Sequence, residues 1–369
     1  MNKATTRRHF ILGSTALLSQ LALPGRALAQ LLKPGAVPTV DSLTVKVITD
    51  SSYDTPRAGS SKWVKVKRAS TAYAADYRRT LHNEWGLALS LESRIGADTR
   101  NLMLDFGWTP TALLNNMELM GVDAGKVQGL IVSHGHFDHY GGLIGFLQKY
   151  RDRLPPDLTL YAGGEDNFCR RMGGGGTPGS FVERGILDRR ELAALKVKVV
   201  LCEQPTVVMG HAFTTGMIDR KSFEDVMPTA PVVYGMKDGV GCNMPVHETK
   251  TQGKPVPDQH YNEHATCFNV KDRGLVVITS CGHTGVVNSV RQAIQVSGIK
   301  KVHAVMGGVH LYAAEEDYLE RTVAELKALN PDVVIPFHCS GPNFTVAVRG
   351  QLGDRLLTST TGTEFTFGA

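Results

Sequence analysis

The chain has 369 residues, 42% of them hydrophobic, and a formal net charge of +5 at pH 7, which is a composition typical of a globular protein. Its first 29 residues hold four basic residues and no acidic one, so that without them the formal charge is +1; the four are Lys3, Arg7, Arg8 and Arg26. A nearly neutral surface argues against general nucleic-acid binding, which depends on a strong positive field.

The start of the chain carries the pattern of an export signal. A twin arginine in Thr6-Arg7-Arg8-His9 precedes a short apolar stretch, and Ala27-Leu28-Ala29 offers the small residues of a cleavage site. A membrane anchor fits less well, because the stretch contains polar residues and falls short of the roughly 20 apolar residues that a span requires. We therefore predict a twin-arginine signal peptide over residues 1–29 and a mature domain over residues 30–369. The expected consequences are recognition by the twin-arginine export machinery, a periplasmic or otherwise exported location, and no stable membrane anchor after cleavage.

Short apolar runs alternate with helical patterns through the rest of the chain. Such alternation predicts an α/β architecture in which helices cover the sheets. Predicted strands cover residues 43–49, 87–91, 101–104, 127–132, 158–162, 197–201, 207–208, 267–270, 275–279, 303–306 and 333–336, and predicted helices cover residues 110–120, 140–150, 285–295 and 314–329.

Two further segments have the composition of loops. Residues 172–179 are too rich in glycine for a regular element and predict a flexible flap. Residues 234–262, rich in glycine, proline and polar residues, predict either an active-site lid or a plain surface excursion.

The six cysteines do not form a compact disulfide pattern. Their even number permits disulfides in an oxidising compartment, but the spacing does not reveal the pairing. The chain lacks a Cys-x-x-Cys pair, which argues against a structural zinc ribbon.

Four potential metal ligands follow the predicted strand over residues 127–132. His134, His136, Asp138 and His139 fall within six positions of a chain that has only 13 histidines. Imidazole and carboxylate groups are the side chains from which catalytic zinc sites are built. This density favours a metal site over a chance grouping of surface histidines.

The order His-x-His-x-Asp-His, together with the glycines after it, resembles the signature of the metallo-β-lactamase fold superfamily. The resemblance implies a four-layer αβ/βα sandwich with two neighbouring metal sites at the strand ends. His134 and His136 would serve the first site, and Asp138 and His139 the second. The resemblance implies no single reaction, because the superfamily contains lactamases, thioesterases, lactonases, nucleases, phosphodiesterases and oxidoreductases.

The same resemblance assigns ligands further along the chain. His264 stands where a histidine before a strand completes the first site, and His338 stands where the last ligand follows a late strand. The bridging aspartate of the family is absent, and Thr279-Ser-Cys-Gly-His283 takes its place. Cys281 or His283 substitutes for it, since a thiolate can ligate zinc, or else neither binds and one site is weak or empty.

The candidate catalytic residues are Asp138, His310 and His283. Asp138 would be a ligand of the second site, or a base that orients the nucleophile if only one metal is held. His310 would contact the substrate or carry a proton, and Asp105 is the best candidate for fixing the imidazole tautomers. The expected cofactor is one or two divalent metal ions, with zinc the foremost choice.

Three short motifs narrow the resemblance to one branch of the superfamily. They are Ser280–Gly285, Gly307–Leu311 and His338–Gly341, and the resemblance covers roughly residues 43–341. This branch includes the archaeal dihydropterin-linked ribofuranosylaminobenzene phosphate synthase and uncharacterised bacterial relatives. An exported location is a poor match to cytosolic pterin biosynthesis, so we do not assign the substrate of that synthase to this chain.

Three functions remain open at this point. The first is an exported metal-dependent hydrolase acting on a small ester, lactone or phosphoester through a metal-activated water. The second is a synthase or transferase acting on a pterin-like or phosphorylated aromatic substrate, which the departure at Cys281 and His283 motivates. The third is a non-catalytic periplasmic metal- or ligand-binding protein.

Overall fold

The computed structural model describes residues 36–52, 61–68, 78–177 and 179–368. The predicted signal peptide, residues 1–29, lies outside the described residues. Within these four ranges, every helix is too short or too polar to cross a membrane.

The first sheet has eight strands and carries the histidine motif at the end of a buried strand. From β5 to β10 its strands run parallel, and the remainder of the sheet is antiparallel. All four residues of β6 are buried, as a near-continuous apolar run predicts for a central strand. In spatial order the strands are β10 (Lys198–Leu201), β7 (Thr159–Ala162), β6 (Gly129–Val132), β5 (Asp98–Leu104), β4 (Ala88–Ile95), β2 (Ser42–Thr49), β20 (Glu364–Gly368) and β3 (Lys65–Lys67).

The second sheet has seven strands and carries the other candidate ligands at its strand ends. Strands β17, β18 and β19 are parallel, so a helix must cross over between each pair. In spatial order the strands are β11 (Val207–Val208), β12 (Ala212–Thr214), β16 (Thr266–Val270), β17 (Gly274–Thr279), β18 (Val302–Gly307) and β19 (Val333–Pro336), with β1 (Thr39–Val40) also paired to β16.

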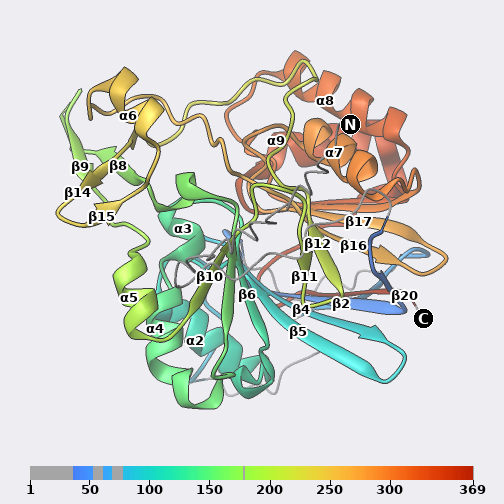
Figure 1. Ribbon diagram of the computed structural model, residues 1–369. Helices are drawn as coiled ribbons and strands as arrows, with labels where there is room; N and C mark the ends of the chain where they lie inside the picture. The colour runs from blue at the N-terminus through green and yellow to red at the C-terminus, as the bar shows by residue number, and fades with distance from the viewer. Residues whose placement is uncertain (1–35, 53–60, 69–77, 178, 369) are drawn as a thin grey trace, which may run out of the picture.

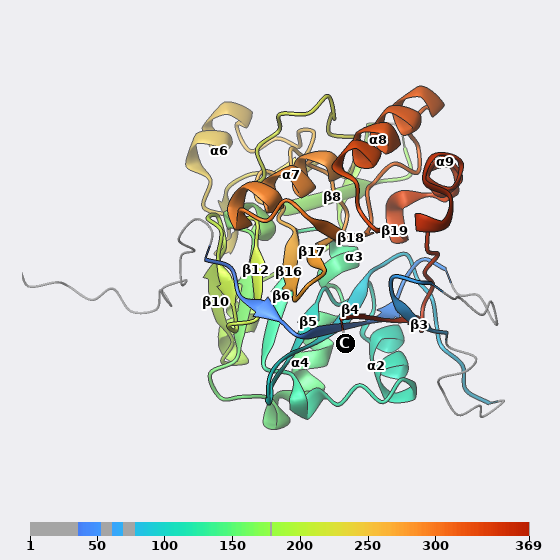
Figure 2. The same cartoon turned by 90° about the vertical axis from the view of Figure 1, so that its right-hand side faces the viewer.

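Helices cover the outer face of each sheet, and the two sheets face each other. Helices α2 (Pro110–Leu119), α4 (Leu143–Tyr150) and α5 (Arg189–Ala194) pack on the first sheet. Helices α7 (Val286–Ser297), α8 (Glu316–Leu329) and α9 (Pro342–Leu352) pack on the second sheet, on the opposite side of the molecule (Figures 1 and 2). This arrangement confirms the predicted four-layer αβ/βα sandwich.

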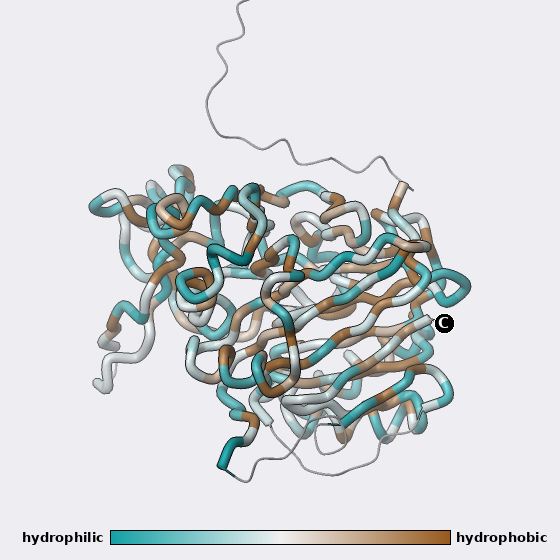
Figure 3. Tube along the Cα trace, turned by 90° about the horizontal axis from the view of Figure 1, so that it is seen from below, coloured by the Kyte–Doolittle hydropathy of each residue, from teal (hydrophilic) through white to brown (hydrophobic). Residues whose placement is uncertain are grey.

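A third apolar core lies between the sheets and comes from the strand residues that point inward. Leu43 and Phe365 of the first sheet meet Phe268, Val276 and Ile335 of the second, and all five are fully buried. In Figure 3 the hydrophobic colour recurs along the strands and gives way to the hydrophilic colour at many of the connecting turns. Burial of apolar side chains on both faces of both sheets therefore holds the four layers together.

A small lobe projects beside the sandwich (Figure 1). Strands β13 (Val232–Val233), β8 (Arg170–Gly174) and β9 (Phe181–Glu183) form its sheet, and β14 (Met236–Lys237) pairs with β15 (Val240–Gly241). Helix α6 (Pro245–Thr251) completes it, and a disulfide joins Cys169 to Cys242. The prediction that residues 172–179 hold no regular element was wrong in part, because β8 extends to Gly174 and pairs with β9.

The remaining helical elements are single turns at the ends of strands and helices. They are α3 (Phe137–Tyr140), which begins inside the histidine motif, and the 3-10 turns Ala124–Lys126, Arg151–Arg153, Glu165–Phe168, His338–Ser340 and Gly353–Arg355.

Candidate metal centre

The histidine motif begins where β6 ends. The buried carboxylate of Asp105, at the end of β5, orients the ring of His139 directly and that of His134 through Ser133. Asp105 accepts hydrogen bonds from the backbone N–H of Ser133 at 2.9 Å and from its hydroxyl at 2.8 Å. His139 Nδ1 lies 2.7 Å from Asp105 Oδ2, and His134 Nδ1 lies 2.9 Å from Ser133 Oγ. With their Nδ1 atoms engaged, both imidazoles keep Nε2 free to bind a metal. Asp105 thus makes the contact that the sequence predicted for it.

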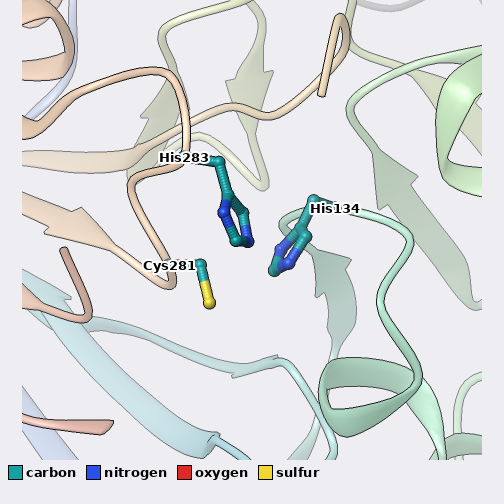
Figure 4. A group of neighbouring side chains, drawn as sticks. All are labelled: His134, Cys281 and His283. Carbon is teal, nitrogen blue, oxygen red and sulfur yellow. The ribbon is translucent and has the colours of Figure 1, made fainter. Parts of the chain in front are cut away.

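The first group of ligands consists of histidines from three separate loops. The ring of His134 lies 4.7 Å from that of His136 and 4.9 Å from that of His283, between centroids. His260 stacks on His283 at 3.8 Å with an interplanar angle of 7°. Figure 4 shows His134 and His283 pointing toward each other from opposite sheets, with Cys281 beside them.

The second group lies next to the first and combines imidazole, carboxylate and thiol. Cys281 Sγ lies 3.2 Å from His139 Nε2. Asp138 Oδ2 lies 3.8 Å from His139 Nε2 and 3.5 Å from His338 Nε2. The sequence predicted Asp138 and His139 as ligands of the second site and His338 as a further ligand, and the structure brings these three side chains close together.

Cys281 belongs to both groups. Its sulfur lies within 4.8 Å of ligand atoms of His134 and His283 on one side, and of His139 and His338 on the other. It therefore occupies the position between the two groups that a bridging aspartate would fill. Burial raises the pKa of its thiol well above the usual value, whereas a cation bound beside it would favour the thiolate.

The free nitrogen atoms of these rings fit a metal centre. Buried ring nitrogens of His134, His136, His283 and His338 have no hydrogen-bond partner. Unpaired buried polar atoms are rare and costly in folded proteins, so a cluster of them calls for a ligand. Burial also lowers the pKa of His134, His283 and His338 well below the usual value, which keeps these imidazoles in the neutral form that binds metals.

His264, predicted as a ligand of the first site, does not lie with the others. Its Nε2 lies 3.1 Å from the backbone oxygen of Val132, and its own backbone N–H donates to Ser133. Among the described residues no candidate ligand group contains it, and His260, four residues earlier, stands with His136 and His283 instead. His264 adjoins β16 and packs against the end of β6, so its side chain serves the contact between the two sheets.

A buried ionic network supports the first group from the side of the small lobe. Arg171 of β8 donates to Asp258 at 2.6 Å and to Asp166 at 3.1 Å, and all three side chains are buried. Asp258 Oδ2 lies 3.7 Å from His136 Nε2, and Asp258 Oδ1 accepts from the backbone N–H of His260 at 2.9 Å. The network therefore ties both rings to the lobe. This network could not be predicted from local sequence patterns, because its members are far apart along the chain.

Two further buried carboxylates hold the backbones of the later ligands. Glu263 accepts from the backbone N–H of His283 at 3.0 Å and from that of Thr284 at 2.7 Å. Asp50 accepts from the backbone N–H of His338 at 2.8 Å. Desolvation by burial raises the pKa of Asp50 to about 7, against the effect of these hydrogen bonds. Both carboxylates thus fix the turns on which the imidazoles stand.

His310, predicted as a substrate contact or proton carrier, lies beside the candidate centre, and a second cysteine lies next to it. Its ring lies 4.2 Å from that of His283, and both of its ring nitrogens lack a hydrogen-bond partner. Its backbone N–H donates to Cys339 Sγ at 3.3 Å, and that sulfur lies 3.2 Å from Cys281 Sγ. Cys339 was not predicted as a site residue, because a single cysteine after His338 carries no spacing signal.

A cavity of about 410 Å³ opens over the candidate centre. Asp138, Cys281, His310 and His338 line it together with aromatic side chains. Asp138, Cys281 and His338 are therefore both buried and within reach of a small molecule, as an active site requires.

Comparison with known families matches one segment of the chain. Residues 93–212, which include the histidine motif, match the sequence profile described as the Metallo-beta-lactamase superfamily. This segment carries a metallo-beta-lactamase superfamily domain.

The similarity to individual proteins extends beyond the matched segment. The chain is 26% identical over 281 residues to the 7,8-dihydropterin-6-methyl-4-(beta-D-ribofuranosyl)-aminobenzene-5'-phosphate synthase of Methanocaldococcus jannaschii. The alignment covers 75% of this chain and 88% of that protein. It is 24% identical over 247 residues to the uncharacterized protein MJ0448 of the same organism, with 67% and 82% covered. These matches agree with the branch that the three short motifs predicted.

A solved structure shows the same fold. The crystal structure of Tm1679, described as a metal-dependent hydrolase of the beta-lactamase superfamily, superposes with a TM-score of 0.61 at 18% identity. The superposition covers 87% of this chain and 98% of Tm1679. It supports the metallo-β-lactamase fold for both halves of the sandwich, including the half that carries Cys281 and His338.

Proposed function

We propose that this chain is an exported metal-dependent hydrolase that uses a metal-activated water on a small ester, lactone or phosphoester. The observation that carries the proposal is the cluster of buried, unpaired imidazoles with Asp138 and Cys281 beneath an open cavity. The cofactor is two divalent ions, zinc first, because imidazole, carboxylate and thiolate together suit this metal.

Each residue has a role in this proposal. His134, His136 and His283 would hold one ion, with His260 beside them, and Asp138, His139 and His338 would hold the other. Cys281 would stand between them. When bound, a divalent metal would lower the pKa of water to about 7 and polarise the electrophile.

His310 is placed to move a proton. Its ring reaches the cavity and has no hydrogen-bond partner on either nitrogen. A histidine in this setting can donate a proton to the leaving oxygen as the scissile bond breaks. Asp105 and Ser133 hold the tautomers of His139 and His134 while this happens.

A second candidate is a synthase or transferase acting on a pterin-like or phosphorylated aromatic substrate. The similarity to the M. jannaschii synthase and the thiol in place of a bridging carboxylate favour it. A non-catalytic metal-binding protein is the third candidate. It fits least well, because structural sites are closed and this cluster faces a cavity.

Export is part of the proposal and rests on the twin-arginine pattern over residues 1–29. The Cys169–Cys242 disulfide agrees with an oxidising compartment such as the periplasm.

Metal analysis of a double variant tests the proposal. His134→Ala combined with His136→Ala should lower the metal content of the purified protein and abolish hydrolysis of ester, lactone and phosphodiester substrates. His82→Ala is the matched control, since His82 is exposed and outside both ligand groups. Full metal stoichiometry in the double variant would refute the assignment. An empty hydrolase screen with tight pterin binding would favour the synthase.

A further inference from the structure

Large aromatic side chains stand exposed around the cavity over the candidate centre. Trp85 is 45% exposed, Trp108 37% and Tyr312 49%, and Phe137 lines the same cavity. Exposed apolar side chains gathered around a cavity mark a binding site more often than a structural need. These four residues are called the aromatic mouth below.

Ring contacts and a backbone hydrogen bond position the aromatic mouth beside the candidate ligands. The ring of Trp85 lies 5.4 Å from that of His338 and 5.7 Å from that of Tyr312. The carboxylate of Glu84 accepts from the backbone N–H of Trp108 at 2.7 Å. A Cβ on Gly141 would lie 2.1 Å from the backbone oxygen of Trp108, so glycine permits a close backbone approach there. Rings positioned in advance lose little entropy when a ligand binds.

Lysine and arginine are absent from the described residues that line this cavity. Arg171 lies behind His136, but it is 1% exposed and engaged by Asp166 and Asp258. Proteins bind phosphate groups chiefly through arginine and lysine side chains and helix N-termini. A phosphate carried on the far part of a substrate would therefore find no cationic side chain among these lining residues.

We infer that the substrate is an acyl ester or lactone whose body is a planar, uncharged aromatic ring system held by the aromatic mouth. The inference rests on the proposed hydrolase and narrows its substrate class. Water adds to the acyl carbon, the carbon–oxygen bond to the leaving alcohol breaks, and the leaving oxygen receives a proton, which gives an acid and an alcohol.

Three acetate esters with similar leaving alcohols test this directly on the metal-loaded mature protein. They are 2-naphthylmethyl acetate, cyclohexylmethyl acetate and the 6-sulfonate of the naphthylmethyl ester. We expect kcat/KM for the naphthylmethyl ester to exceed that for the cyclohexylmethyl ester by about tenfold, because ring contacts of this kind contribute about a factor of ten. The sulfonate should lower kcat/KM by about tenfold as well, since a charge entering an apolar mouth loses its hydration.

Substitutions in the aromatic mouth test whether its residues cause the preference for the naphthylmethyl ester. Trp85→Ala and Tyr312→Ala should each raise KM for the naphthylmethyl ester and leave the cyclohexylmethyl ester nearly unchanged. Phe181→Ala is the control, because Phe181 is a comparably exposed aromatic residue of β9 that does not line the cavity. Equal kcat/KM values for the two neutral esters, a preference for the sulfonate, or no effect of either mouth variant would overturn the inference.

A binding measurement separates this inference from the proposed function. If no ester, lactone or phosphodiester is hydrolysed, the hydrolase proposal fails, whereas calorimetric titration with 2-naphthylmethanol and cyclohexylmethanol still tests the aromatic mouth. Tighter binding of the naphthyl alcohol, lost in Trp85→Ala, supports the mouth. Equal binding of the two alcohols contradicts it.

Discussion

Cys281 is the residue on which the two ligand groups converge. Its sulfur is the shared member of the groups around His134 and His139. Cys281→Ser should therefore lower the metal content from two ions per chain toward one, because a neutral hydroxyl is a far poorer ligand than a thiolate. Elemental analysis of the purified variant measures this. Cys202→Ser is the control, since Cys202 is also buried and lies outside the groups, and equal metal content in all three proteins would rule out the bridging role.

Substitutions of His260 and His264 should have different effects on the metal content of the protein. His260→Gln should reduce the metal content, because its ring stacks on His283 and approaches His136. His264→Gln should leave it unchanged, because the glutamine amide can still bond to the Val132 carbonyl that His264 now contacts. The reverse result would restore the ligand set that the sequence pattern implied.

The limits of sequence reasoning are visible in these same residues. His134, His136, Asp138 and His139 were predictable because one short segment carries their whole spacing. The choice between His260 and His264 depends on how the chain enters β16, which no local spacing records. Cys339 and Arg171 join the site only through contacts made across the fold.

Among the elements, the small lobe departs most from expectation. Its strand β8 buries Arg171 within a glycine-rich sequence, and only partners from distant segments make that burial tolerable. By contrast, β6 and β17 were predictable, since every residue in each is buried and apolar runs with this character are typical of central strands. Central strands such as β6 and β17 could be predicted from their apolar residues alone. Strand β8 could not, because its burial depends on ion pairs between Arg171 and residues from distant segments.

The disulfide of the small lobe should stabilise the protein, and its removal can be measured. The Cys169–Cys242 disulfide closes a loop with a sequence separation of 73. Replacing both cysteines by serine should lower the midpoint of thermal unfolding, because disulfides that close long loops stabilise proteins by about 2–4 kcal/mol. Differential scanning calorimetry measures the midpoint, and Cys202→Ser again provides the control. An unchanged midpoint in the double variant would show that the bond does not constrain the unfolded chain.

In the whole molecule, the ends of strands from two facing sheets build one candidate site. The motif at the end of β6 supplies four candidate ligands, and the turns after β17 and β19 supply the further candidates Cys281, His283 and His338. The four-layer sandwich could be predicted from the superfamily resemblance and from the alternation of strands and helices. The alternation alone did not specify how the two sheets face each other.

Export of the whole chain can be tested through the twin arginine. Arg7→Lys combined with Arg8→Lys should leave uncleaved precursor in the cytoplasm, whereas the unaltered chain should appear outside it with Gln30 as its first residue. Cell fractionation followed by intact-mass measurement checks both results. Arg26→Lys is the control, because Arg26 lies outside the twin-arginine pair, and equal export of all three chains would contradict the signal assignment.

We propose that the two facing sheets hold a pair of divalent metal ions between them. Elemental analysis combined with anomalous diffraction on the purified mature protein would detect such a pair. We expect two zinc ions per chain, one beside His134, His136 and His283 and one beside Asp138, His139 and His338, with the sulfur of Cys281 between them. A single ion, or metal bound by His264 instead of His283, would contradict it.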